Sequence, residues 1–186
     1  NPIQRAIING DKETGICTMI TELGLDCGDV CMREKIEIPD NMTCVDLFER
    51  ISVDSPALLE KTLIGLVDKT ISPEKQCETG VCLANKLIKE ETLIDWSKSA
   101  QDIHNLVRGI YKMPSAYFIY NGKVVKVLET RVLKDVSGEC GIFSRVTKEG
   151  IEVGCGQDSI LLIKVKPEGK GEMFARDWAN GLHIAK

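Results

Sequence analysis

The segment GLDCGDV, residues 24–30, combines two carboxylates and one thiol with two glycines, and it closely follows an apolar run at residues 16–20. Asp26 and Asp29 flank Gly28. A tight turn accounts for the glycines, because glycine adopts backbone conformations that other residues avoid. An aspartate that hydrogen-bonds its own backbone is also common in turns. The segment is therefore either a structural turn or part of a site where a carboxylate acts in proton transfer.

Cysteine is the other reactive residue type in the chain. The eight positions are Cys17, Cys27, Cys31, Cys44, Cys77, Cys82, Cys140 and Cys155. A zinc site uses closely spaced pairs of ligands, and the nearest spacings here, Cys27-x₃-Cys31 and Cys77-x₄-Cys82, are looser, with both histidines far away in sequence. We therefore expect free thiols and no metal site. We interpret Cys27 as a packing residue and not as a nucleophile.

The composition is typical of a globular protein with a hydrophobic core, since 43% of the 186 residues are hydrophobic. No apolar run approaches the roughly 20 residues that span a bilayer, and no basic-then-apolar leader precedes Asn1. We expect a cytoplasmic protein that does not enter a membrane. The chain opens on Asn1 in what reads as the first turn of a helix, so we also expect further residues upstream.

Charge is distributed unevenly along the chain. Residues 1–90 contain 10 Lys and Arg against 16 Asp and Glu, whereas residues 91–186 contain 14 against 12. The second part is therefore the more favourable place for a polyanion to bind. The candidate phosphate contacts are Lys123, Lys126, Arg131, Lys164, Lys166 and Lys170. Ordinary solubilising charge is the alternative interpretation of these six side chains.

The hydrophobic pattern of the first part predicts one short helix and two strands. Residues 2–9 read as a helix, and residues 15–23 and 29–38 as neighbouring strands on either side of the opening loop. Arg5 and Lys12 are interpreted as solvated charges, as exposed helix charges usually are.

A helical pattern follows and then a linker. Thr43 can cap a helix whose apolar positions repeat with helical spacing, and Ser55-Pro56 predicts that a second helix starts there. Residues 72–93 have weak periodicity and several helix breakers, which is typical of a linker. We therefore place a first α/β unit at residues 1–71.

Residues 94–186 begin with a helix and continue as β-structure. Residues 94–110 have a helical apolar face, with Ser97 or Ser99 as the cap. Residues 116–133 predict a hairpin around Asn121-Gly122, and residues 142–167 predict further short strands. A terminal helix is expected at residues 173–180. This content favours a small five-stranded Greek-key barrel of the oligonucleotide-binding (OB) type.

Four ordered segments give the chain a specific resemblance to the methionyl-tRNA formyltransferase family. They are PIQRAIINGDKETG (2–15), ELGLDCGD (22–29), IDWSKSAQDIHNLVRG (94–109), and PEGKGEM followed by NG (167–181). The resemblance covers the whole chain. It implies an α/β plus all-β protein: the later part of a Rossmann-like formyltransferase domain at residues 1–71, a linker at 72–93, and an OB-like tRNA-binding domain at 94–186.

The resemblance also implies roles for the opening loop. Asp26 matches a catalytic aspartate that would hold and polarise a histidine, and Gly24, Leu25 and Gly28 match the loop that contacts the folate. Asp29 either supports this loop or contacts substrate, and both interpretations stay open.

The other catalytic residues of the family, an asparagine and a histidine, match positions upstream of residue 2, together with a Ser-Leu-Leu-Pro segment that holds the folate. His104 and His183 cannot replace that histidine, because the first lies on the helix after the linker and the second behind the predicted barrel. We therefore expect this polypeptide to be inactive by itself.

The implied reaction is transfer of a formyl group from 10-formyltetrahydrofolate to the α-amine of methionyl-initiator-tRNA in translation initiation. The implied enzyme uses no metal and is a monomer when full length. Two alternatives stay open. A folate-dependent formyltransferase acting on a sugar-nucleotide amine would share GLDCGD but need not share PEGKGEM, and the isolated chain could instead be a non-catalytic tRNA-binding remnant.

Overall fold

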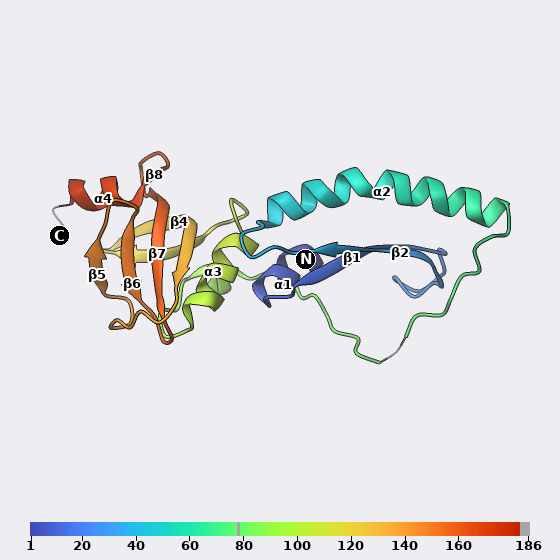
Figure 1. The fold of residues 1–186 in the computed structure, drawn as a ribbon, viewed down its shortest axis with the longest axis horizontal. Coiled ribbons are helices and arrows are strands. Elements are labelled where there is room, and N and C mark those ends of the chain that lie inside the picture. The colour runs from blue at the N-terminus through green and yellow to red at the C-terminus, as the bar shows by residue number, and fades with distance from the viewer. Residues whose placement is uncertain (78, 183–186) are drawn as a thin grey trace.

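An antiparallel hairpin forms the centre of the first part of the protein in the computed structural model, which describes residues 1–77 and 79–182 (Figure 1). Helix α1 (Pro2–Ile8) precedes strands β1 (Glu13–Met19) and β2 (Val30–Glu37). The two strands pair antiparallel, with Glu13 opposite Glu37. The predicted helix and two neighbouring strands are therefore confirmed, but β1 ends at Met19 and not at residue 23, so the loop is longer than expected.

A single long helix, α2 (Cys44–Val67), lies along this hairpin (Figure 1). It begins with a reciprocal cap, in which the Thr43 hydroxyl accepts from the Asp46 N–H and the Asp46 carboxylate accepts from the Thr43 N–H. No helix within the described ranges is both long and apolar enough to cross a membrane.

The predicted break at Ser55-Pro56 is wrong, because α2 continues through Pro56. An interior proline costs one backbone hydrogen bond and strains the preceding turn. Packing beyond the proline offsets this cost, since Leu58 and Thr62 are buried and the Thr62 hydroxyl lies 2.8 Å from that of Thr18 on β1.

The linker returns on the side of the hairpin opposite to α2 (Figure 1). It contains one short 3₁₀ helix, η1 (Lys89–Thr92). Earlier in the linker, Glu74 and Val30 exchange two backbone hydrogen bonds of 2.8 and 2.9 Å, so this point of the linker extends the edge of β2.

Arg5 attaches the linker to α1 and is not a solvated charge. Its guanidinium donates to both carboxylate oxygens of Glu91, at 2.6 and 2.9 Å, and to the Asn85 carbonyl at 3.0 Å. The hydrogen bonds from Arg5 lower the pKa of Glu91 to about 2. Lys12 pairs with Asp40 at 2.6 Å, but that pair is exposed.

The second part is an antiparallel sheet covered by α3 (Ala100–Gly109) and α4 (Ala175–Gly181). Its strands are β3 (Ala116–Tyr120), β4 (Lys123–Leu133), β5 (Phe143–Val146), β6 (Ile151–Gly154), β7 (Ser159–Pro167) and β8 (Met173–Phe174). The strand order is β3-β4-β7-β6-β5, and β8 pairs with β7. The hairpin at Asn121-Gly122 is confirmed, with positive φ at both residues. The terminal helix starts two residues later than expected.

The sheet does not close into the predicted OB-type barrel. In the described residues no backbone pairing joins the edge strands β3 and β5. The segment before α3 occupies part of the β3 edge instead, since Ile94 donates its N–H to the Tyr117 carbonyl at 2.8 Å. Aromatic side chains span the remaining opening, and the Tyr120 and Phe143 rings stack 5.4 Å apart.

Helix α3 joins the two parts because it buries side chains against both. Its apolar residues enter the core of the sheet, whereas His104 and Arg108 reach the β2–α2 connection. Arg108 Nη1 donates to the Pro39 and Met42 carbonyls, at 3.3 and 3.1 Å. These bonds hold the connection before α2 against α3.

His104 lies in the same junction between two hydrogen-bond partners. Its Nε2 is 3.1 Å from the Asp40 carbonyl, so this nitrogen is the donor, and Nδ1 accepts from the Thr130 hydroxyl at 2.8 Å. Burial lowers the pKa of His104 below its ordinary value; the hydrogen bond to the Asp40 carbonyl opposes this shift, and the nearby charge of Arg108 adds to it. The ring is therefore held neutral in the folded protein.

The depressed pKa of His104 predicts a pH-dependent stability. Below the ordinary value of 6.5, the unfolded chain takes up the proton more readily than the folded one. The free energy of unfolding should therefore fall as the pH drops below 6.5, until the folded-state pKa is passed. Urea denaturation between about pH 7 and pH 5.5 measures this, and His104→Gln should flatten the dependence. Equal slopes for the two proteins would contradict the assignment.

Candidate functional site

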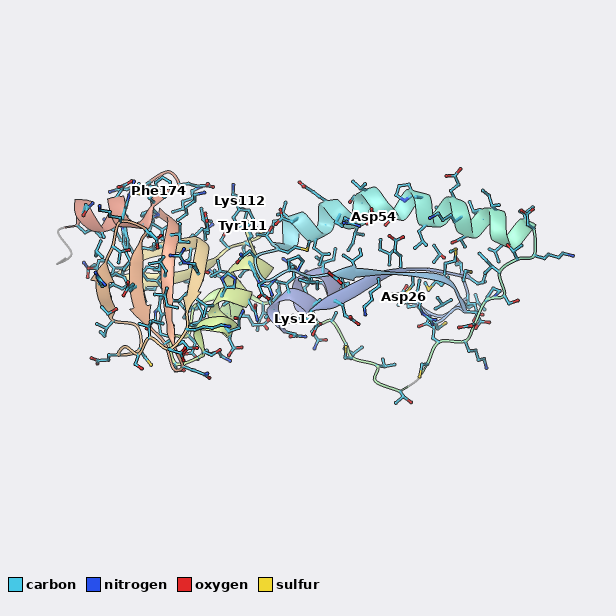
Figure 2. The ribbon with its side chains drawn as sticks, in the orientation of Figure 1. Lys12, Asp26, Asp54, Tyr111, Lys112 and Phe174 are labelled. Carbon is cyan, nitrogen blue, oxygen red and sulfur yellow. The ribbon has the colours of Figure 1, made fainter. Side chains whose placement is uncertain are left out.

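The loop between β1 and β2 lies at the end of the hairpin farthest from the second sheet (Figure 2). Its base is closed by a 2.9 Å hydrogen bond from the Ile20 N–H to the Asp29 carbonyl. Asp26 has a positive φ of 53°, a left-handed conformation that aspartate tolerates better than most residues. Its side chain is exposed and forms no hydrogen bond or ion pair within residues 1–77 and 79–182. In the described residues no backbone N–H donates to this carboxylate, so the turn interpretation gains no support from such a bond.

Close backbone packing explains one of the two glycines in this loop. A Cβ at Gly28 would lie 1.7 Å from the Ile20 carbonyl oxygen, so no larger residue fits there. A Cβ at Gly24 would lie 2.5 Å from Cys27 Sγ, a contact that a side-chain movement can relieve. Between them Leu25 is 97% exposed. The loop thus presents an apolar side chain and a carboxylate to its surroundings.

A linker residue completes the loop, and the sequence analysis missed it. Gln76 Nε2 donates to the carbonyl oxygens of Asp26 and Gly28, both at 2.8 Å. The only sequence signal was a polar residue in a segment without periodicity, which does not distinguish Gln76 from its neighbours.

The six predicted phosphate contacts are not equivalent. Lys164 pairs with Glu129 at 3.0 Å, and Arg131 pairs with Glu149. Lys126 and Lys166 instead lie directly opposite each other on β4 and β7, both exposed. Like charges at opposed positions repel, so this pair creates a local positive potential. Lys123 and Lys170 are also exposed, at the two adjacent turns.

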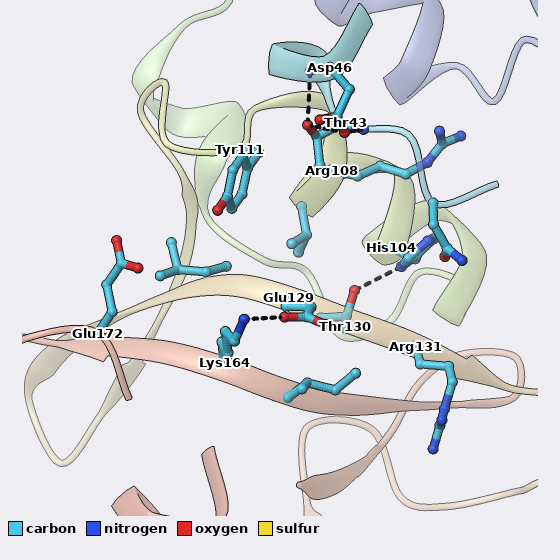
Figure 3. A pocket seen from close by; sticks show the side chains of 14 residues that line it. Thr43, Asp46, His104, Arg108, Tyr111, Glu129, Thr130, Arg131, Lys164 and Glu172 are labelled. Atoms are coloured by element: carbon cyan, nitrogen blue, oxygen red, sulfur yellow. Dashed lines mark hydrogen bonds and ion pairs between the residues drawn. The ribbon is translucent and has the colours of Figure 1, made fainter. Parts of the chain in front are cut away.

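A pocket of about 520 Å³ lies where the first part meets the second sheet (Figure 3). His104, Arg108 and Thr130 form part of its wall, and Arg131 and Lys164 lie at its β4 and β7 side. Asp26 is at the other end of the hairpin (Figure 2). The structure therefore does not bring the predicted cations and the predicted catalytic aspartate together.

All eight cysteines are free thiols, since none of them forms a disulfide. Burial raises the pKa of Cys155 to about 11, which disfavours its thiolate. Cys27 is exposed, so its interpretation as a packing residue is wrong. The described residues contain no group of three or more His, Cys, Asp or Glu side chains placed to hold a metal ion.

Comparison with known proteins identifies the family. Residues 86–183 match the formyl transferase C-terminal domain, and residues 1–63 match the formyl transferase model. A methionyl-tRNA formyltransferase from Clostridium perfringens is 41% identical over 181 residues, 97% of this chain. The chain belongs to the formyl transferase family. It spans 59% of the length of that relative.

Solved structures share the fold at low sequence identity. HypX from Aquifex aeolicus, in complex with tetrahydrofolic acid, has a TM-score of 0.73 at 14% identity and covers 100% of this chain and 33% of its own. The N-formyltransferase from Helicobacter canadensis, in complex with folinic acid and dTDP-3-aminofucose, has a TM-score of 0.63 at 19% identity. The match covers 86% of this chain and 59% of the Helicobacter canadensis chain.

The packing of Gly28 predicts the effect of a single methyl group. Gly28→Ala should displace the loop from Ile20 and lower the free energy of unfolding by about 1–3 kcal/mol, as overpacking does. Gly171→Ala is a matched control, because a Cβ at Gly171 meets nothing within 4 Å. Urea denaturation of both variants measures the difference. A Gly28→Ala protein as stable as the control would disprove the close approach.

Proposed function

We propose that this chain is the later part of a methionyl-tRNA formyltransferase, which transfers a formyl group from 10-formyltetrahydrofolate to the α-amine of methionyl-initiator-tRNA in the cytoplasm. The observation that carries this proposal is 41% identity to the Clostridium perfringens enzyme across 97% of the chain, both parts included. Residues 1–71 would serve the chemistry, residues 72–93 would connect, and residues 94–186 would bind tRNA.

The reaction requires a base and hydrogen-bond donors at one carbon. The attacking amine must lose a proton, and the formyl oxygen becomes negative when the new C–N bond forms, before the bond to the folate N10 breaks. Asp26 supplies an exposed carboxylate without an intramolecular partner in the described residues. Such a carboxylate can orient a histidine from upstream residues and raise its pKa.

The exposed loop around Asp26 suits contact with the folate. Gly24 and Gly28 keep the backbone free of side-chain bulk, and Leu25 offers an apolar surface to a flat ring. We propose no metal in the reaction, because formyl transfer to an amine needs only proton transfer and oxyanion stabilisation.

A sugar-nucleotide amine is the alternative acceptor. The Helicobacter canadensis structure contains such a compound, but its 19% identity speaks for the fold alone. The much higher identity to a methionyl-tRNA formyltransferase favours tRNA.

The role of Asp26 can be tested in a chimera in which residues 1–186 replace the matching part of the Clostridium perfringens enzyme. Asp26→Asn keeps the shape but loses the charge, so kcat should fall by about 10²-fold or more, with a smaller change in KM. The matched control is Asp11→Asn, an exposed aspartate outside the loop. The 186-residue polypeptide alone should show no turnover. An unchanged kcat in Asp26→Asn would show that Asp26 is only a structural residue of the loop.

The tRNA proposal can be tested by salt dependence. We expect the opposed Lys126 and Lys166 to contact phosphates more than Arg131 does, because Glu149 neutralises Arg131. Replacing both lysines with Gln should weaken tRNA binding and make the slope of log K against log salt shallower by about 2. Arg131→Gln is the control and should change the slope less. Circular dichroism checks folding, and equal slopes for the double variant and the wild type would exclude this surface.

A further inference from the structure

The side-chain amide of Gln76 crosses from the linker to the Asp26 loop. Both amide hydrogens are used, one on the Asp26 carbonyl and one on the Gly28 carbonyl, each at 2.8 Å. Both partners are acceptors only, so the opposite orientation of the amide would place oxygen against oxygen. Gln76 is therefore specifically a double donor.

These two bonds hold the part of the loop that carries Asp26. Within residues 1–77 and 79–182, Gln76 is the only side chain that hydrogen-bonds the backbone of residues 21–28. The accepting carbonyls belong to the Asp26–Cys27 and Gly28–Asp29 peptide planes. Fixing those planes restrains the left-handed backbone of Asp26 and hence the direction in which its side chain leaves the chain.

The linker presents Gln76 from a fixed backbone. Two residues earlier, Glu74 exchanges both backbone hydrogen bonds with Val30 at the start of β2. The Glu74 carboxylate also lies 3.5 Å from the Arg33 guanidinium. The backbone pairing of Glu74 with Val30 thus fixes the distance that the Gln76 side chain spans to the loop.

We propose that Gln76 is a positioning residue for the catalytic loop: it holds the Asp26 carboxylate in the direction needed for formyl transfer without touching the reacting atoms. This inference rests on the proposed function of Asp26. The role of Gln76 also means that the linker contributes to the chemistry, besides joining the two parts of the chain.

The structural half of the proposal is tested on the 186-residue polypeptide by NMR. Loss of a hydrogen bond to a carbonyl changes its carbonyl ¹³C shift, so Gln76→Ala should move the shifts of Asp26 and Gly28. Lys75→Ala, an exposed neighbour in the same linker, is the matched control and should leave both unchanged. Shifts that are the same in Gln76→Ala as in the wild type would overturn the proposal.

The functional half is tested in the Clostridium perfringens chimera. Gln76→Ala and Gln76→Glu both lack the two donors and should lower kcat by about 10-fold, with KM nearly unchanged, because misorientation affects the reacting geometry more than binding. Gln76→Lys keeps donors and should recover part of the loss. Full activity in both donor-free variants would overturn the inference.

A double variant separates this inference from the proposed function. If Gln76 acts through Asp26, then Gln76→Ala should cause little further loss in an Asp26→Asn background. If the fold losses in kcat of the two single variants instead multiply in the double variant, Gln76 acts elsewhere. That result would overturn the inference, while the proposed role of Asp26 stands. An Asp26→Asn chimera with normal kcat would instead remove that role, and the inference with it.

Discussion

The arrangement of the two parts depends on the hydrogen bonds that the buried guanidinium of Arg108 donates. It donates to two carbonyls of the β2–α2 connection while its helix packs on the second sheet. Hydrogen bonds from a charged group contribute about 1.5–3 kcal/mol each, and leaving the buried guanidinium without these acceptors would cost its desolvation. Neutral His104 satisfies the adjacent carbonyl of Asp40. Together these contacts fix the position of the β2–α2 connection, and therefore the position of the hairpin and its loop relative to the second sheet.

The linker is a structural element, although most of it lacks regular secondary structure, and three attachments within its described residues are the most specific. Near α1 it is held by Arg5, whose side chain is 19% exposed, against 36% for its partner Glu91. Exposed ion pairs contribute little, but a bidentate pair with added carbonyl contacts has the better geometry. The other attachments are the Glu74 bridge and the Gln76 amide.

Local patterns predicted local structure well. The alternation around Asn121-Gly122 and the capping sequence at Thr43 depend on neighbouring residues, and both features form as expected. The helix break expected at Ser55-Pro56 is an exception, because packing overrides that local pattern. Two further errors concern distant contacts: Arg5 meets a residue 86 positions away, and Gln76 meets Asp26 from 50 positions away. No periodicity in the linker encodes such contacts. The prediction that Asp26 is catalytic came from family resemblance, since its residue type and loop alone also fit a turn.

The backbone contact at the β3 edge of the open second sheet has a consequence for association between molecules. An exposed sheet edge offers unpaired N–H and C=O groups to a neighbouring chain. On β3, the bond from Ile94 to Tyr117 occupies part of that edge. The opposite edge, β5, has only four residues, and a β-irregularity between Phe143 and Arg145 interrupts its pairing. Both margins of the sheet are therefore poor templates for intermolecular strand pairing, which protects an open sheet from edge-to-edge aggregation.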